Sequence, residues 1–332
     1  MQSIFLGLLA TAGVAHAGGF EAKTMRDPLS AREVERGLVL GKGWLNFTLA
    51  TDIKSATGFW GPDGEAEDFE DATWLYTTQS FDFRYGISRR TELFWTFKTH
   101  YVNLQNDTLG TDITQFGLGD PVFGIRYELF RSIAPLTSAI AYFKYKAPLA
   151  NETPGNFVGG PNTFSRVVLT TGTPDLHFGG AIKRQFSFLA IDADASYIFR
   201  TSGVPLYAIE TQNNQFNARI KPGDVVRLQA RLTAQVSLFA LQGGAVFESR
   251  QPTRVGNTSS GLLPSSNLND IEGSEGTALD ATAGVVANLT RGIDLEFQAR
   301  FPITGEDLLF FPIEDIHPTR GITYTGAFEF RY

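Results

Sequence analysis

The stretch TYTGAFEFRY, residues 323–332, decides the fold, because its side chains alternate between aromatic and small or polar. Successive side chains of a β-strand point to opposite faces. One face of this run is therefore aromatic, with Tyr324, Phe328, Phe330 and Tyr332. In a soluble protein such a tail frays unless it is docked, whereas in a membrane strand an aromatic face meets lipid. The rest of the sequence decides between these environments.

Alternation with period two dominates the sequence from Gly43 onward. DVVRLQARLTAQV (224–236) places valine, leucine and alanine on one face and arginine, glutamine and threonine on the other. Twelve such runs lie near 43–54, 74–86, 91–103, 115–130, 135–148, 173–184, 188–200, 223–236, 238–250, 277–289, 292–302 and 321–332. Most are longer than the roughly five or six residues typical of globular strands. They reach the ~9–11 residues with which a tilted strand crosses a bilayer.

The connections between these runs alternate in length. Short ones lie near 86–91, 130–135, 184–187, 236–238 and 289–292, and long ones near 55–73, 104–114, 149–172, 201–222, 251–276 and 303–320. This alternation is typical of outer-membrane barrels, which have short periplasmic turns and long extracellular loops. We therefore predict an all-β fold, a transmembrane antiparallel up-and-down β-barrel of about twelve strands over residues 43–332. The alternative is a secreted soluble sandwich or propeller, whose strands are shorter.

Barrel closure explains the aromatic C-terminal run. Lipid offers the backbone no hydrogen-bond partners, so a sheet in a bilayer must have no open edges. The last strand then pairs with the first, and its aromatic face lies in lipid. We expect Phe330 and Tyr332 to be read by the β-barrel assembly machinery of a Gram-negative outer membrane.

The N-terminal residues predict export. Residues 1–17 combine an apolar run with Ala15-His16-Ala17, a small-x-small cleavage site, and so resemble a secretory signal peptide. Residues 18–42 form a periplasmic N-terminal stretch without alternation. Within it, Ser30 and Glu33 have capping-box spacing and Leu29 and Val34 have staple spacing, which predicts a short helix over 31–36. We expect this helix to plug the lumen, to close its periplasmic mouth, or to belong to a tethered N-terminal arm.

Composition excludes several classes of protein. The 332 residues include no cysteine, so disulfides and cysteine metal sites are absent from this sequence. The net charge of −7 argues against a nucleic-acid partner. Aromatic residues make up 13% of the chain although its mean hydropathy is only −0.08, as expected for apolar residues alternating with polar ones.

The polar faces of the runs supply candidate lumen-lining residues. They are Arg84, Lys98, His100, Asp120, Arg126, Lys144, Lys146, Asp192, Asp194, Arg227, Arg231, Glu296 and Arg300, together with other acidic residues such as Glu92, Glu128, Asp280, Asp294 and Glu329. One interpretation is that these charges pair across neighbouring strands and fix the register. The other is that they line a water-filled path and select solutes.

Signals for metal binding and catalysis are weak. The acidic loop at 61–71 carries Asp63, Glu65, Glu67 and Asp68, oxygen ligands that suit Ca²⁺, but the spacing is not that of an EF-hand. We favour a solvated loop there and predict no cofactor. G-x-S-x-G, H-E-x-x-H and P-loop motifs are missing from the sequence, so we expect no enzymatic activity.

Short motifs resemble the outer-membrane transporter family linked to the meta-pathway of phenol degradation. GLGDPVFGIRYELF (117–130) carries the Gly-x-Gly-Asp that opens a strand in that family, here Gly117, Gly119 and Asp120. KYKAPLAN (144–151) and IKPGDVVRL (220–228) are similar to further strand boundaries, although the first lacks the family's glycine. The resemblance implies a barrel that passes small hydrophobic or aromatic compounds.

We therefore predict an outer-membrane channel or uptake barrel for small solutes. The alternative is a non-conducting structural or interaction barrel that acts through its extracellular loops. The expected surroundings are outer-membrane lipid and lipopolysaccharide. Only the channel interpretation needs a continuous wet path past residues 18–36.

Overall fold

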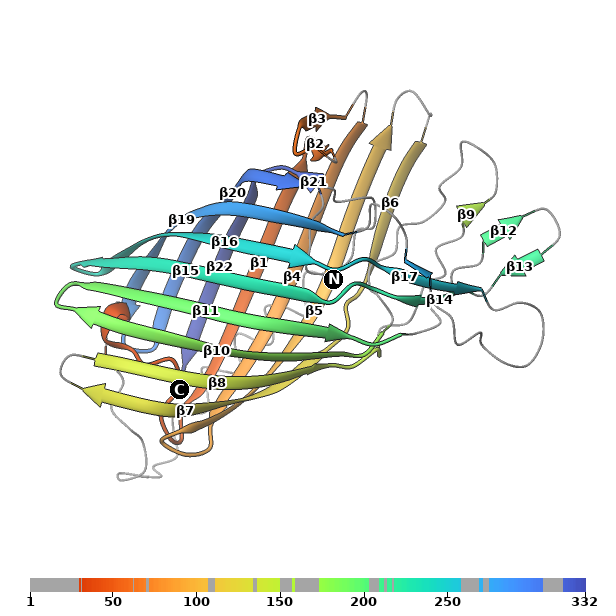
Figure 1. Ribbon diagram of the computed structural model, residues 1–332. Helices are drawn as coiled ribbons and strands as arrows, with labels where there is room; N and C mark the ends of the chain where they lie inside the picture. The colour runs from red at the N-terminus through yellow and green to blue at the C-terminus, as the bar shows by residue number, and fades with distance from the viewer. Residues whose placement is uncertain are drawn as a thin grey trace, which may run out of the picture.

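The protein forms a closed antiparallel β-barrel of twelve strands, as predicted (Figure 1). The computed structural model describes residues 30, 32–61, 63–69, 72–106, 111–133, 136–149, 157–158, 173–202, 209–211, 214–216, 218–257, 269–270, 275–306 and 319–332. The barrel strands are β1 (Leu45–Ala56), β4 (Ala72–Gly86), β5 (Thr91–Asn106), β6 (Thr111–Leu118) with β7 (Val122–Ile133), β8 (Leu136–Lys146), β10 (Asp175–Phe186), β11 (Leu189–Arg200), β15 (Val225–Val236), β16 (Phe239–Arg250), β19 (Gly276–Thr290), β20 (Ile293–Glu306) and β22 (Thr323–Arg331). Each pairs with its neighbours in the chain.

Pairing between the first and last strands closes the ring. β1 runs antiparallel to β22, from Asn46 opposite Arg331 to Lys54 opposite Thr323. Just beyond the strand ends, Leu45 and Tyr332 exchange two backbone hydrogen bonds of 2.8 Å. The aromatic C-terminal run is therefore the closing strand, and both of its edges are hydrogen-bonded.

The fourth barrel strand is interrupted, unlike the continuous run predicted over 115–130. β6 pairs with the extracellular half of β5 and β7 with the periplasmic half. Gly119, Asp120 and Pro121 separate the two, because proline cannot donate to the ladder and is confined to strand starts and edges. The amide of Gly119 still donates to the carbonyl of Lys98 at 2.8 Å, so the break is local.

Side-chain exposure alternates along the strands as the sequence predicts. On β15, Leu228 and Leu232 are exposed at 45% and 48% on the outer face, whereas Thr233 and Gln235 on the inner face are buried. Large exposed hydrophobic residues of this kind occur on strands all around the barrel. A soluble monomer rarely exposes so much contiguous apolar surface. This outer face is suited to lipid.

Tight turns and small sheets occupy opposite ends of the barrel. Two-residue turns connect β10 to β11 and β15 to β16, and their first residues, Ser187 and Ser237, have φ values of 57° and 56°. The long connections carry three small sheets (Figure 1). Their strands are β2 (Gly58–Trp60), β3 (Ala66–Asp68) and β21 (Thr319–Arg320); β9 (Phe157–Val158), β12 (Ile209–Thr211) and β13 (Asn214–Phe216); and β14 (Ala218–Lys221), β17 (Arg254–Asn257) and β18 (Asn269–Asp270). The end with tight turns is the periplasmic one by the rule for outer-membrane barrels.

The helix predicted over 31–36 is instead a single 3₁₀ turn, η1 (Glu33–Glu35). The predicted capping box is absent: the Ser30 hydroxyl accepts from the Arg32 amide and donates to the Glu35 carboxylate. The reason lies in the barrel wall, because Gln235 accepts the amide proton of Glu33 and Lys183 donates to the carbonyl of Glu33. Leu29 of the predicted staple lies outside the described residues. Among the described segments, no helix has the length and apolarity needed to cross a membrane.

The outward orientation of Leu228 gives a direct test of the barrel faces. We expect Leu228→Arg to lower the free energy of unfolding in phospholipid vesicles by about 2–4 kcal/mol, because it places a charge in lipid. The matched control is Gln229→Arg, one residue along β15 and directed to the lumen, which should change the free energy much less. Urea titration followed by tryptophan fluorescence measures both. Equal losses for the two variants would contradict the assignment of faces.

Candidate functional site

Residues 32–42, called here the N-terminal segment, cross the inside of the barrel at its periplasmic end. At one end, the amide of Glu33 donates to Oε1 of Gln235 on β15 at 3.0 Å. At the other, the amide of Leu40 donates to Oε2 of Glu92 on β5 at 2.6 Å. β5 and β15 lie on opposite sides of the strand ring. Val34 and Leu40 are buried, so these side chains of the segment are enclosed by other parts of the protein.

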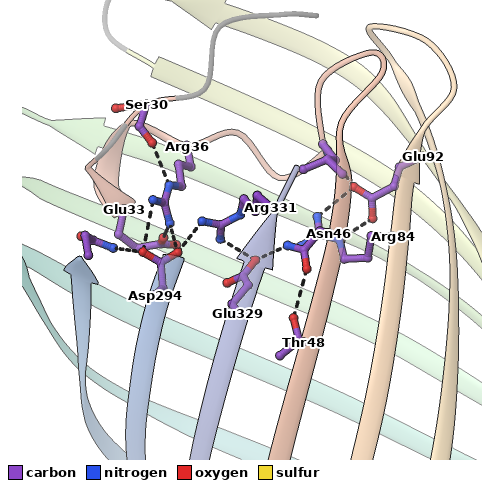
Figure 2. Close-up of polar contacts among 12 residues, drawn as sticks. Ser30, Glu33, Arg36, Asn46, Thr48, Arg84, Glu92, Asp294, Glu329 and Arg331 are labelled. Carbon is purple, nitrogen blue, oxygen red and sulfur yellow. Dashed lines mark hydrogen bonds and ion pairs between the residues drawn. The ribbon is translucent and has the colours of Figure 1, made fainter. Parts of the chain in front are cut away.

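The carboxylate of Asp294, on β20, is the first anchor of this segment. Nη1 of Arg36 lies 2.6 Å from its Oδ2, and Arg331 of the closing strand donates to the same oxygen. Nδ2 of Asn288 donates to its other oxygen at 2.8 Å. Asp294 is only 1% exposed, and a buried carboxylate without such donors would be strongly unfavourable. Figure 2 shows the Arg36, Asp294 and Arg331 side chains converging.

The network continues from Asp294 across the seam that closes the barrel (Figure 2). Nη2 of Arg331 lies 2.5 Å from Oε1 of Glu329. The same Glu329 oxygen accepts a hydrogen bond from Nδ2 of Asn46 on β1. Polar side chains therefore connect the N-terminal segment with both strands of the closing pair.

Glu92, on β5, is the second anchor. Its carboxylate is fully buried and accepts from Arg84 at 2.7 and 2.8 Å and from Arg126 at 3.0 Å, in addition to the Leu40 amide. Arg84 and Arg126 come from β4 and β7, the strands on either side of β5. The carboxylate thus joins three strands and the N-terminal segment at one point.

Glu33 and Arg36 are held in their charged forms by their surroundings. Burial acts to raise the pKa of Glu33, but the cations Lys183, Arg36, Arg331 and Arg231 outweigh it and keep the pKa below its ordinary value of 4.5. Burial likewise acts to lower the pKa of Arg36, and Glu33 and Asp294 outweigh that effect and raise it. The two side chains also pair directly, with Nη1 of Arg36 2.9 Å from Oε2 of Glu33.

Most of the candidate lumen-lining charges pair with a residue on the adjacent strand. The pairs are Arg231 with Asp192 at 3.1 Å, Arg227 with Glu248 at 2.5 Å, Arg300 with Asp280 at 2.5 Å, and Lys146 with Asp175 at 2.7 Å and Asp120 at 3.9 Å. Asp192 and Arg231 lie directly opposite each other in the ladder, as do Arg227 and Glu248. Such cross-strand pairs support the register.

The remaining candidates occupy inward positions with other contacts. Asp194 accepts from the Tyr142 hydroxyl at 2.9 Å, and the Lys144 ammonium lies 4.9 Å from the centre of the Tyr142 ring. Nδ1 of His100 lies 3.1 Å from the hydroxyls of Tyr76 and Thr78. By alternation, Lys98 and Glu296 share the inner faces of β5 and β20 with His100 and Asp294, respectively.

The described acidic side chains of the loop at 61–71 are exposed to solvent. Asp63, Glu65 and Glu67 are exposed. Asp68 pairs with Arg320 at 2.8 Å. In the ranges that the structure describes, no group of three or more acidic or histidine side chains is placed to hold a metal ion.

The chain is similar to known proteins in its fold and not in its sequence. No protein-family model and no curated protein sequence matches it. Among solved structures, the COG4313 outer membrane channel from Pseudomonas putida F1 matches with a TM-score of 0.63 at 12% identity, over 92% of this chain and 99% of that one. The β-domain of the Bordetella autotransporter BrkA (TM-score 0.46, 10% identity, 87% and 99% of the chains) and the translocator domain of NalP from Neisseria meningitidis (0.43, 9%, 100% and 95%) are less similar. The protein therefore has the fold of an outer-membrane β-barrel.

The lowered pKa of Glu33 predicts how docking of the N-terminal segment depends on pH. A depressed carboxyl pKa contributes stability that is complete above the ordinary value and is lost as pH falls through the lowered one. The Glu33 contribution should therefore be constant from pH 7 down to the ordinary glutamate pKa of 4.5, and it should be lost only as the pH falls below that value. A spin label at an introduced Arg32→Cys, in a chain without native cysteine, reports the mobility of the segment.

Glu33→Gln is the control for this titration. It removes the Glu33 charge that attracts Lys183 and pairs with Arg36, while Arg36 keeps Asp294, so the label should already be more mobile at pH 7. Mobility that rises between pH 7 and pH 5 in the unsubstituted protein would contradict the assignment. So would a Glu33→Gln variant with the same mobility and the same pH profile as the unsubstituted protein.

Proposed function

We propose that the protein is an outer-membrane channel for uptake of small solutes, closed at rest by its N-terminal segment. The observation that carries this proposal is the way in which the segment is held. Side chains of the wall, above all Asp294 and Glu92, bind it, and it forms no strand pairing with the barrel within the described residues. A segment held by side chains can leave without opening the sheet.

The anchors remain satisfied when the segment leaves. Asp294 loses Arg36 but keeps Arg331 and Asn288 as donors. Glu92 loses one amide and keeps Arg84 and Arg126. Breaking a buried ion pair is costly mainly because it strands an uncompensated charge. Here the remaining donors on the wall compensate both carboxylates. Undocking of the segment is therefore reversible and does not destabilise the barrel.

The class of solute and the cellular location form part of the same proposal. The short motifs around Asp120 and Asp224 resemble a transporter family for small hydrophobic or aromatic compounds, and the similar structure from P. putida is an outer membrane channel. Export through a signal peptide over residues 1–17, which lie outside the described part of the chain, would bring the protein to the outer membrane. Phe330 and Tyr332, both exposed on the closing strand, are suited to recognition by the assembly machinery.

A second function is favoured by the exposed long loops. The acidic loop at 61–71 is fixed to the opposite end of the sequence, because β2 pairs with both β3 and β21. An ordered, acidic extracellular surface suits a barrel that acts by binding through its loops, including binding of lipopolysaccharide through divalent ions. That function does not require the lumen to open.

Single-channel conductance in a planar bilayer separates these functions. We expect the chain from Gly18 onward to conduct in brief openings, and the variant lacking residues 18–36 to conduct steadily. Asp294→Asn should lengthen the openings, because it weakens the contact with Arg36 and leaves the segment otherwise unchanged. Asp270→Asn is the matched control, since its pair with Arg254 is exposed outside the barrel wall.

Uptake of a small solute into liposomes should follow the same order among the variants. If the variant lacking residues 18–36 folds but carries no current, the channel function is refuted and the loops remain as the functional surface. Folding is checked independently by the faster migration of an unheated barrel in gel electrophoresis.

A further inference from the structure

Two arginines on the lumen side lie together near the extracellular end of the barrel. Arg200 ends β11 and Arg250 ends β16, and β15 runs between these strands (Figure 1). Val225 of β15 is opposite Ile198 on one side and opposite Arg250 on the other. Arg200 lies two residues beyond Ile198 on the same face. The guanidinium groups therefore belong to one small area of the wall.

Both arginines are buried without hydrogen-bond acceptors for part of their guanidinium groups. Arg200 is 1% exposed and Arg250 is 5% exposed. Among the described residues, Nε and Nη1 of Arg200 and Nε and Nη2 of Arg250 have no hydrogen-bond partner. A buried cationic group in this state is strongly unfavourable unless another group compensates it. Arginine cannot relieve the cost by losing its proton.

The neighbouring carboxylates are already used by other cations. Oδ2 of Asp175 lies 4.0 Å from Nε of Arg200 but 2.7 Å from the Lys146 ammonium. Glu248, two residues before Arg250, binds Arg227 at 2.5 Å and lies 3.5 Å from Arg300. The charges that act on Arg250 are the repulsion of Arg200 and the attraction of this shared Glu248. The two guanidinium groups therefore share their nearest carboxylates with other cations.

A small apolar cluster adjoins the two arginines. Ile198 and Val225 form a buried pair, and the partly buried Trp60 and Ala278 pack against it. These four residues are called here the lumenal apolar patch. Trp60 comes from β2 in the first long connection, so a loop and the wall both contribute to the patch. A guanidinium group binds a carboxylate with two parallel hydrogen bonds. Two guanidinium groups beside apolar side chains are therefore suited to a ligand that has a carboxylate and an apolar part.

We propose that Arg200 and Arg250 form a binding site for the carboxylate of a small amphipathic solute, with Trp60 and Ala278, the partly buried members of the lumenal apolar patch, contacting its apolar part. The inference deepens the proposed channel function, on which it rests, by naming the class of solute. The site lies at the extracellular end, so a solute reaches it before it reaches the N-terminal segment. Binding supplies the acceptors that the two guanidinium groups lack.

Calorimetric titration of the full chain in lipid nanodiscs tests the site with hexanoate, hexanamide and inorganic phosphate as probes. We expect hexanoate to bind, and Arg200→Gln and Arg250→Gln each to weaken it at least about tenfold, the loss expected for a charge-assisted hydrogen bond. Hexanamide, which has the same length but no charge, should bind weakly and equally to all variants. Arg254→Gln, an exposed arginine beyond the end of β16, should bind hexanoate like the unsubstituted protein.

Thermal unfolding without ligand distinguishes a binding role from a structural one. Removing an uncompensated buried charge should leave the midpoint of Arg250→Gln equal or higher, whereas a structural arginine would give a lower midpoint. Hexanoate should raise the midpoint of the unsubstituted protein and not that of Arg250→Gln. These readouts also confirm that each variant folds.

Three results would overturn the site: unchanged hexanoate affinity in both glutamine variants, phosphate binding as tight as hexanoate binding, or a lower midpoint for ligand-free Arg250→Gln. Liposome flux separates this proposal from the channel function. Flux without hexanoate binding would refute the site alone. Hexanoate binding with no flux of any solute would refute the channel and leave the site.

Discussion

Closure of the sheet between β1 and β22 is the constraint on which the rest of the structure depends. In lipid an unpaired strand edge is prohibitive, so the first and last strands must meet in one register. That register brings Arg331 and Glu329 of β22 beside Asn46 of β1 and Asp294 of β20. The charged cluster at the periplasmic mouth is a consequence of the closing pair. The N-terminal segment, which directly precedes β1, binds to that cluster through Arg36.

Charged side chains on the inner wall of the barrel have two roles, to support the strand register and to hold the N-terminal segment. Many of these charges form cross-strand pairs that support the register, such as Asp192 with Arg231 and Arg227 with Glu248. Asp294 and Glu92 also hold the N-terminal segment, and each accepts further hydrogen bonds from side chains of the wall. The wall partners of both carboxylates therefore come from the barrel itself and not from the segment. This property suits a channel whose closure is separate from its folding.

The sequence predicts the strands well because their signal is local. Alternation over residues 223–236 matches the observed β15 (Val225–Val236) closely, and exposure alternates along that strand as predicted. The break between β6 and β7 was missed because the alternation extends over 115–130, although Pro121 was a visible signal for it. The 3₁₀ turn at Glu33–Glu35 replaced the predicted helix because the barrel wall, which lies far away in sequence, binds its backbone groups.

The site could be predicted only in part. Alternation places Asp294, Glu92, Arg227 and Arg300 on the polar faces of their runs. It cannot show that Asp294 binds Arg36, because that contact joins residues 258 positions apart and depends on closure of the ring. The same holds for Arg200 and Arg250, whose strands become near neighbours only through β15. Sequence periodicity predicts which face of its strand each side chain occupies. Only the order of the strands in the closed barrel determines which of these side chains become neighbours.

Amide hydrogen exchange of the protein in a lipid bilayer tests the central claim most directly. If the N-terminal segment is docked as described, the amides of Glu33 and Leu40, which donate to Gln235 and Glu92, should exchange far more slowly than those of an unstructured peptide. Their exchange should accelerate in Asp294→Asn while the amides of β1 stay protected. Exchange of Glu33 and Leu40 at the rate of an unstructured peptide, with β1 fully protected, would show that the lumen is not closed by this segment.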